Sequence, residues 1–186
     1  MKQAHKKRPP RATANSPPGL PDMGKLLYKS DNYKWFEILD NTAYYREFEK
    51  SEKIIWGLTA DKWAYTLDTE QHYLPSNAYI LTSETIPIRF ILGLLNSKLL
   101  RYYFGFIGVM TAGGAYTLKA STIEALPIAI GTKQQQKEIA LKVENILNAK
   151  ATNKQTDVSS SEHEIDCLVY NLYGLSENEI KIVEGV

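Results

Sequence analysis

The stretch from Thr111 to Ile130 reads TAGGAYTLKASTIEALPIAI and joins a glycine pair, an alternating segment and a Leu-Pro-Ile exit. Gly113 and Gly114 can adopt positive φ and let the backbone approach another surface closely. Apolar and polar side chains alternate from Tyr116 to Ser121, which predicts a strand. A helical turn that Ser121 or Thr122 caps and Pro127 ends should follow. This stretch therefore predicts a surface that a ligand or partner approaches closely.

The length of 186 residues fits one domain, or one domain with an appendage. The single cysteine, Cys167, cannot form an internal disulfide, so we expect a cytoplasmic protein. We expect Cys167 itself to lie in the core, where free cysteines usually lie. Charged and polar residues interrupt the longest apolar run, 86–106, which therefore predicts a core helix and not a membrane span.

The net charge of +1 is unevenly distributed along the chain. Residues 1–30 hold seven Lys or Arg against one Asp, whereas the remainder holds 15 against 20, so the body carries −5. Residues 1–24 have too few apolar side chains to form a core and predict a disordered, basic, proline-rich arm. The arm either lies on DNA phosphates or is a linker. An acidic body requires any DNA-binding surface to be local.

The rest of the chain predicts an α+β fold. Residues 53–57, 63–68 and 78–82 have strand patterns, and a helix capped by Thr85 should run to about Phe104 with apolar residues on nearly every side. We therefore expect an irregular, twisted β region packed on a long buried helix in residues 25–131. In residues 132–186, capping boxes at Thr132, Ser161 and Ser176 predict a helical hairpin and a last short helix.

No constellation in the sequence indicates catalysis. His5, His72 and His163 are isolated, and Gly113-Gly114 precedes a strand, so a phosphate cradle at a helix N-terminus does not fit. Two candidate binding surfaces remain, because basic residues interleaved with aromatic ones can contact phosphates and base edges. The first comprises Tyr44, Arg46, Lys50, Lys53, Trp56, Lys62 and Trp63, and the second comprises Thr111, Gly113, Gly114, Tyr116, Thr117 and Lys119.

Each surface has an alternative interpretation. Glu47, Glu49 and Glu52 alternate with the basic residues of the first surface, which is also typical of a solvated, salt-bridged face. On the second surface, Lys119 fits equally well as an ordinary solvent-facing strand residue. Within the DNA-binding interpretation, we expect Arg46 to read a base and Lys119 to contact a phosphate.

Seven segments of the chain resemble, in the same order, the TaqI-like C-terminal specificity domain of restriction-modification DNA methyltransferases. Ser51 and Glu52 stand where a proline is common in that family, and Ala129 stands where a second proline often ends the exit. The seven segments are 35–39 (WFEIL), 44–56 (YYREFEK and KIIW), 77–82 (NAYILT), 94–99 (LLNSKL), 113–119 (GGAYTLK), 123–128 (IEALPI) and 164–175 (EIDCLVYNLYGL).

This resemblance implies a specificity-domain fold and a function. The chain would be a target-recognition domain that reads double-stranded DNA and performs no chemistry, while a methyltransferase or nuclease domain or subunit acts on the DNA. S-adenosylmethionine would bind to that catalytic domain, and no cofactor would bind here. The alternative is a protein-interaction module that docks a methyltransferase or nuclease subunit without reading DNA.

Overall fold

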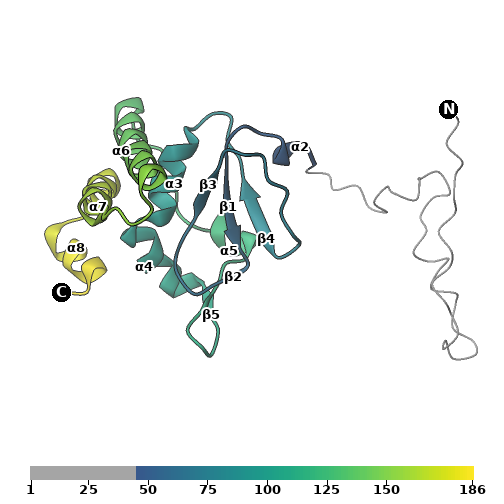
Figure 1. Cartoon of the computed structure of the whole chain (residues 1–186). Helices are drawn as coiled ribbons and strands as arrows, with labels where there is room; N and C mark the ends of the chain where they lie inside the picture. Colours follow the sequence, from purple (N-terminus) through teal and green to yellow (C-terminus); the bar gives the residue numbers. More distant parts are fainter. Residues whose placement is uncertain (1–44) are drawn as a thin grey trace, which may run out of the picture. The chain divides into compact units, whose positions relative to one another are not determined.

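A computed structural model describes residues 45–186 of the chain (Figure 1). Tyr44, the predicted arm 1–24 and the motif 35–39 lie outside the described residues. The chain divides at residues 45 and 46, and residues 46–186 form one compact unit. The elements in order are α2 (Tyr45–Phe48), β1 (Lys53–Gly57), β2 (Thr59–Ala60), β3 (Thr66–Asp68), β4 (Ala78–Leu81), α3 (Ile88–Asn96), α4 (Lys98–Ile107), β5 (Val109–Met110), β6 (Tyr116–Thr117), α5 (Ala120–Glu124), α6 (Lys133–Thr152), α7 (Ser159–Tyr173) and α8 (Glu177–Glu184). The predicted α+β class is confirmed.

The first sheet has the order β3-β1-β4, and both pairings are antiparallel. Strand β1 has the predicted bounds, and β4 ends one residue earlier than predicted. The predicted strand 63–68 is wrong in its first half, because only Thr66–Asp68 pairs with β1. The side chain of Trp63 donates instead to the carbonyl of Leu95 at 2.7 Å, and the amide of Tyr65 donates to the Asn96 side chain at 2.9 Å.

The predicted single helix from Thr85 to Phe104 is wrong, because two helices occupy the region. Helix α3 begins after Pro87, and extended backbone at Ser97 (ψ 152°) separates it from α4. The Ser97 hydroxyl donates to the Leu94 carbonyl at 2.6 Å and accepts from the Leu100 amide at 3.3 Å. Ser97 therefore ends one helix and caps the next. Helix α3 is buried almost throughout, as predicted for the long helix, whereas α4 buries only Leu100 and Phe104.

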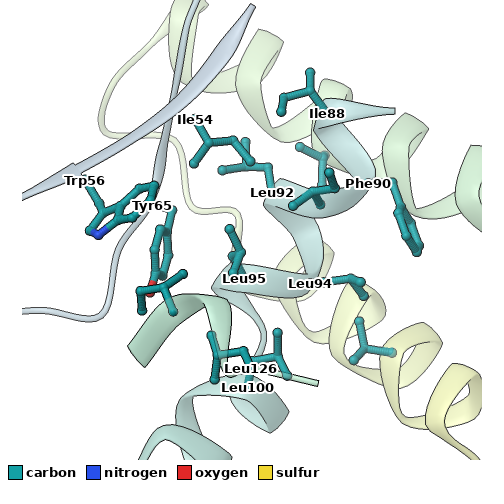
Figure 2. Packing of buried hydrophobic residues seen from close by; sticks show 14 of the residues in the cluster. Ile54, Trp56, Tyr65, Ile88, Phe90, Leu92, Leu94, Leu95, Leu100 and Leu126 are labelled. Carbon is teal, nitrogen blue, oxygen red and sulfur yellow. The ribbon is translucent and has the colours of Figure 1, made fainter. Parts of the chain in front are cut away.

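The hydrophobic core surrounds α3 (Figure 2). Helix α3 contacts β1 and β3 on one side and α6 on the other, and α7 packs on α6 (Figure 1). Gly93 lies where the helices are closest: a Cβ atom placed there would be 2.8 Å from Cγ2 of Ile139 on α6 and 3.7 Å from Cγ2 of Ile165 on α7. The C-terminal helices therefore share the core of the preceding segment.

The predicted packing of the two long C-terminal helices is confirmed. The capping boxes at Thr132 and Ser176 form as predicted. The cap at Ser161 is wrong, because α7 begins at Ser159, whose amide donates to the Asp157 carboxylate at 3.0 Å. Cys167 is exposed, which corrects its predicted place in the core. Among residues 45–186, no helix is both long and apolar enough to cross a membrane.

Candidate nucleic-acid interface

Strands β5 and β6 form a short hairpin whose tip is the predicted glycine segment. Val109 pairs with Thr117, and Met110 pairs with Tyr116. At the tip, the Thr111 hydroxyl accepts from the Ala115 amide at 3.1 Å, and the Gly114 amide donates to the Thr111 carbonyl at 2.9 Å. Gly114 has φ 82°, which confirms the predicted positive φ at this residue.

The predicted strand from Tyr116 to Ser121 is shorter than expected. It ends at Thr117, and Lys119 precedes the first turn of α5, so neither Ser121 nor Thr122 is the cap. The reason lies in the core: Leu118 is fully buried, its amide donates to the Leu58 carbonyl at 2.7 Å, and its carbonyl accepts from Trp56 Nε1 at 3.0 Å. These contacts fix the base of the hairpin to the first sheet.

Helix α4 fixes the direction of the hairpin. Gly108 follows α4, and a Cβ atom on it would be 2.2 Å from the ring of buried Phe104, so only glycine lets the chain pass over this ring. The Arg101 side chain donates to the Tyr116 hydroxyl at 3.1 Å. Figure 1 shows the connection after β5 projecting beyond α4 and the first sheet. The hairpin is therefore an exposed projection on a rigid base.

We define the hairpin surface as six residues around this projection. Strand β2 pairs with β6 on the side opposite β5, with Ala60 opposite Tyr116, and the chain bends at the exposed residues Asp61 and Lys62 directly after β2. Trp63 fills the space beneath, with its ring 5.7 Å from that of Tyr116 and 5.0 Å from that of Phe104. The hairpin surface comprises Lys62, Arg101, Thr111, Gly113, Gly114 and Tyr116.

The charge around the hairpin surface differs from that of the whole body. No Asp or Glu occurs in residues 85–123, which hold Arg89, Lys98, Arg101 and Lys119. Residues 157–186, in contrast, hold seven acidic residues against one Lys. In the described part of the chain, neither Lys62 nor Arg101 forms a salt bridge. Arg89 pairs with Glu52 and Lys98 pairs with Glu184, so Lys62 and Arg101 are the unpaired cations of the hairpin surface, and exposed Asp61 adjoins Lys62.

Two residues of the first predicted surface are corrected. Lys53 is fully buried, with its ammonium 2.5 Å from the Asp68 carboxylate and 2.9 Å from the Phe48 carbonyl. Trp56 is buried beneath Leu118. Neither side chain can reach a phosphate or a base. Burial would raise the pKa of Asp68, but hydrogen bonds from Lys53, from His72 and from two backbone amides lower it below its usual range.

The remaining cations of the first surface lie far from the hairpin. Figure 1 places α2 and β5 at opposite ends of β1. Arg46 is exposed on α2, and Lys50 pairs with Glu84 at 2.8 Å, which raises the pKa of Lys50. The Glu47 carboxylate accepts from the Thr82 hydroxyl at 2.6 Å. The partner of Lys50 is therefore Glu84 and not one of the alternating carboxylates, and Glu52 pairs with Arg89.

The structure thus divides the predicted site residues into separate groups. Lys62 and Trp63 join the predicted hairpin residues, whereas Arg46 and Lys50 do not. Thr117 is half-buried in the sheet, and Lys119 is exposed at the base of the hairpin. Arg101 was not among the predicted site residues, and its contact with Tyr116 is seen only in the folded chain. The signal in the sequence is the run of residues 85–123 without Asp or Glu, which the net charge of the whole body conceals.

The described residues offer few groups that could bind a metal or the phosphates of a nucleotide. Among residues 45–186, no cluster of three or more His, Cys, Asp or Glu side chains could hold a metal ion. Cys167 Sγ lies 3.7 Å from His163 Nε2 on the exposed side of α7, which supplies only two ligands. Gly113 and Gly114 lead into β6 and not into a helix, so they do not fit the phosphate cradle that a nucleotide cofactor requires.

A known protein family matches more than half of the chain. The family model for the TaqI-like C-terminal specificity domain matches residues 22–128. This range includes both sheets and helices α3, α4 and α5, and it ends with the Leu-Pro-Ile exit. The resemblance in residues 164–175 lies outside the matched range. No curated protein matches the chain.

Proposed function

Because this chain belongs to the family of TaqI-like C-terminal specificity domains, whose role is DNA recognition in restriction-modification enzymes, we propose that it reads duplex DNA through the hairpin surface. The chemistry would belong to a methyltransferase or nuclease domain or subunit. S-adenosylmethionine would bind that catalytic partner and not the residues described above.

The observation that carries this proposal is the acid-free run of residues 85–123 around an exposed hairpin. Phosphates attract unpaired Lys and Arg side chains, and backbone amides and hydroxyls at a glycine-rich tip can approach DNA closely. Lys62 and Arg101 supply the cations here, and Thr111 and Gly113 supply the polar tip. The α2 end is the weaker candidate, because the Lys50 charge is already satisfied by Glu84.

Fluorescence anisotropy with the full chain and a labelled random duplex tests this proposal. We expect weak binding that falls steeply with salt, since each phosphate contact contributes about −0.9 to the slope of log K against log[salt]. Lys62→Ala and Arg101→Ala should each reduce the slope by about 1. Lys137→Ala is the matched control, because Lys137 is an exposed, unpaired lysine on α6. Loss of binding in Arg46→Ala, with no effect of Lys62→Ala, would place the DNA at the α2 end instead.

A second candidate function rests on the acidic C-terminus. Residues 157–186 include α7 and α8 and would repel DNA, but they could dock a methyltransferase or nuclease subunit. A cleft of about 310 Å³ between these helices is lined by His163, Tyr170, Leu175 and Ile180. If the chain formed a stable complex with the purified methyltransferase of its own system and bound no DNA, alone or in that complex, this interaction-module function would replace DNA reading.

A further inference from the structure

The exposed side chain of Arg101 is held at its inner nitrogen and is free at its outer end. Its Nε donates to the Tyr116 hydroxyl at 3.1 Å. A guanidinium is a planar fork of N–H donors, and Nε supplies only one of them. In the part of the chain that the structure describes, Arg101 forms no salt bridge. The two terminal amino groups are therefore available to a ligand that offers a pair of acceptor oxygens or nitrogens.

The Tyr116 hydroxyl is an acceptor with a fixed position. Tyr116 pairs with Ala60 on one side and with Met110 on the other. Its ring lies edge-to-face against those of Trp63 and Phe104, with centroids 5.7 Å and 6.0 Å away. Strand pairing and ring packing together hold the hydroxyl in place, so its hydrogen bond determines where the guanidinium plane lies. A guanidinium that is already oriented loses less rotamer freedom when it binds a ligand.

The fold does not depend on this hydrogen bond. The base of the hairpin is already held by the bonds of Leu118 to Leu58 and Trp56. An exposed bond between a long side chain and a hydroxyl adds little stability, because water offers the same bonds and the side chain loses rotamer freedom. The geometry of the bond is therefore better explained by what it does for the outer end of Arg101.

The position of Arg101 favours a phosphate over a base edge as its ligand. Gly113 at the tip precedes Tyr116 by three positions. At about 3.3 Å per residue, the tip extends up to about 10 Å beyond the Tyr116 backbone. The major groove of DNA is about 8.5 Å deep. A tip that reaches the base edges would therefore leave Arg101, at the foot of the hairpin, at the level of the phosphates.

We propose that Tyr116 is a positioning residue, whose hydroxyl orients the Arg101 guanidinium so that its two terminal amino groups bind one DNA phosphate. This inference rests on the proposed DNA-binding function and deepens it. It assigns Arg101 to the DNA backbone and makes that contact depend on an uncharged hydroxyl. The contact fixes the position of the hairpin on the duplex and does not distinguish base sequences.

Anisotropy measurements over a range of salt concentrations test the inference with the full chain and two labelled duplexes, one of A·T pairs only and one of mixed sequence. Tyr116→Phe should weaken binding to both by about three- to ten-fold, the usual effect of one hydrogen bond. The salt slope should stay the same, because no charge is removed. Arg101→Lys should behave like Tyr116→Phe, because an ammonium keeps the charge but lacks the planar fork. In the Arg101→Ala background, Tyr116→Phe should have no further effect.

Tyr103→Phe provides the matched control, because Tyr103 is 38% exposed on the same helix and lies two residues beyond Arg101, on the opposite side. This variant should bind both duplexes like the wild type. Circular dichroism melting shows whether each variant is folded, and Tyr116→Phe should melt at the wild-type temperature.

The other outcomes separate this inference from the proposed function. If Arg101→Ala lowers the salt slope but Tyr116→Phe binds like the wild type, the positioning role is overturned and the proposed function stands. An equal loss from Tyr116→Phe with and without Arg101 would mean that the hydroxyl contacts DNA itself, which also overturns the positioning role. A loss confined to the mixed-sequence duplex would assign Arg101 to a guanine edge and overturn the phosphate contact. If the wild-type chain shows no salt-dependent binding to either duplex, both proposals are wrong.

Discussion

Gly93→Ala should destabilise the protein, although alanine is the better helix former. In the interior of α3 the substitution gains about 1 kcal/mol of helix propensity. Against this, the new methyl group would lie 2.8 Å from Cγ2 of Ile139 and 3.0 Å from Cγ2 of Val143, whereas carbon atoms pack best at about 3.5 to 4.0 Å. Both neighbours are β-branched residues in a helix, where χ1 is nearly fixed, so they cannot rotate away cheaply.

The net change in stability is the cost of overpacking minus the gain in helix propensity. Overpacking of this kind costs about 1 to 3 kcal/mol, and two stiff neighbours place Gly93→Ala in the upper half of that range. We therefore expect the free energy of unfolding to fall by about 1 to 2 kcal/mol. Gly105→Ala is the matched control, because a Cβ atom at Gly105 on α4 meets nothing within 4 Å. This substitution should raise the free energy of unfolding by about 0.5 kcal/mol or slightly more.

Urea denaturation followed by circular dichroism measures both variants. A double-mutant cycle with Ile139→Ala isolates the contact, because removing the clashing methyl group should make Gly93→Ala at least about 1 kcal/mol less costly. The reasoning is refuted if Gly93→Ala is as stable as the wild type, or if its cost is unchanged in the Ile139→Ala background. Either result would mean that α3 and α6 are not in direct contact at Gly93.

Four further outcomes follow from the other contacts, each checked by denaturation or melting. Lys53→Met should cost about 3 to 5 kcal/mol, because it leaves the buried Asp68 carboxylate without its cation; a cost below 1 kcal/mol would show that Asp68 is hydrated. The lowered pKa of Asp68 means that its contribution is complete above about pH 4 and is lost as pH falls through the folded-state pKa, so Asp68→Asn should flatten the acid limb of a pH-stability curve. Tyr65→Phe should be neutral or stabilise by about 1 kcal/mol, because the buried Tyr65 hydroxyl has no hydrogen-bond partner among the described residues; a clear loss of stability would reveal one. Gly108→Ala should cost about 1 to 3 kcal/mol by displacing Phe104, and an unchanged melting temperature would mean that the hairpin leaves α4 differently.

The sequence predicted elements best where a local signal fixed them. The strand at Lys53–Gly57 has an apolar pattern of its own, and the boxes at Thr132 and Ser176 depend on residues three positions apart. Errors arose where a hydrogen bond that the pattern does not show decided the outcome. Ser97 looks like an ordinary helix-interior residue, but its hydroxyl bonds to the Leu94 carbonyl, and α4 starts there. Ser161 has a suitable capping partner, but Asp157 starts α7 earlier.

In the candidate site, too, the residues with a local signal were predicted, and those whose role depends on tertiary contacts were not. The sequence indicated the glycine tip because Gly114 has an intrinsic tolerance of positive φ. It did not reveal that Lys53 is buried, since the residue that neutralises this lysine, Asp68, is fifteen positions away and belongs to another strand. Arg101 was missed because its link to the hairpin, through the Tyr116 hydroxyl, exists only once α4 and β6 have packed together.

The anchoring of the hairpin separates what the tip does from what keeps the protein folded. Its base is held by the Leu58 and Trp56 hydrogen bonds to Leu118, whereas a Cβ atom at Gly113 meets only the Thr111 hydroxyl, at 3.9 Å, and one at Gly114 meets nothing. Residues 112 and 113 can therefore be exchanged with little thermodynamic penalty, provided that Thr111 keeps its hydrogen bond to the Ala115 amide and Gly114 keeps its left-handed backbone. Such a loop is a natural graft point: new tips could be selected from libraries on an unchanged scaffold, and natural variants could diversify there without first acquiring compensating mutations.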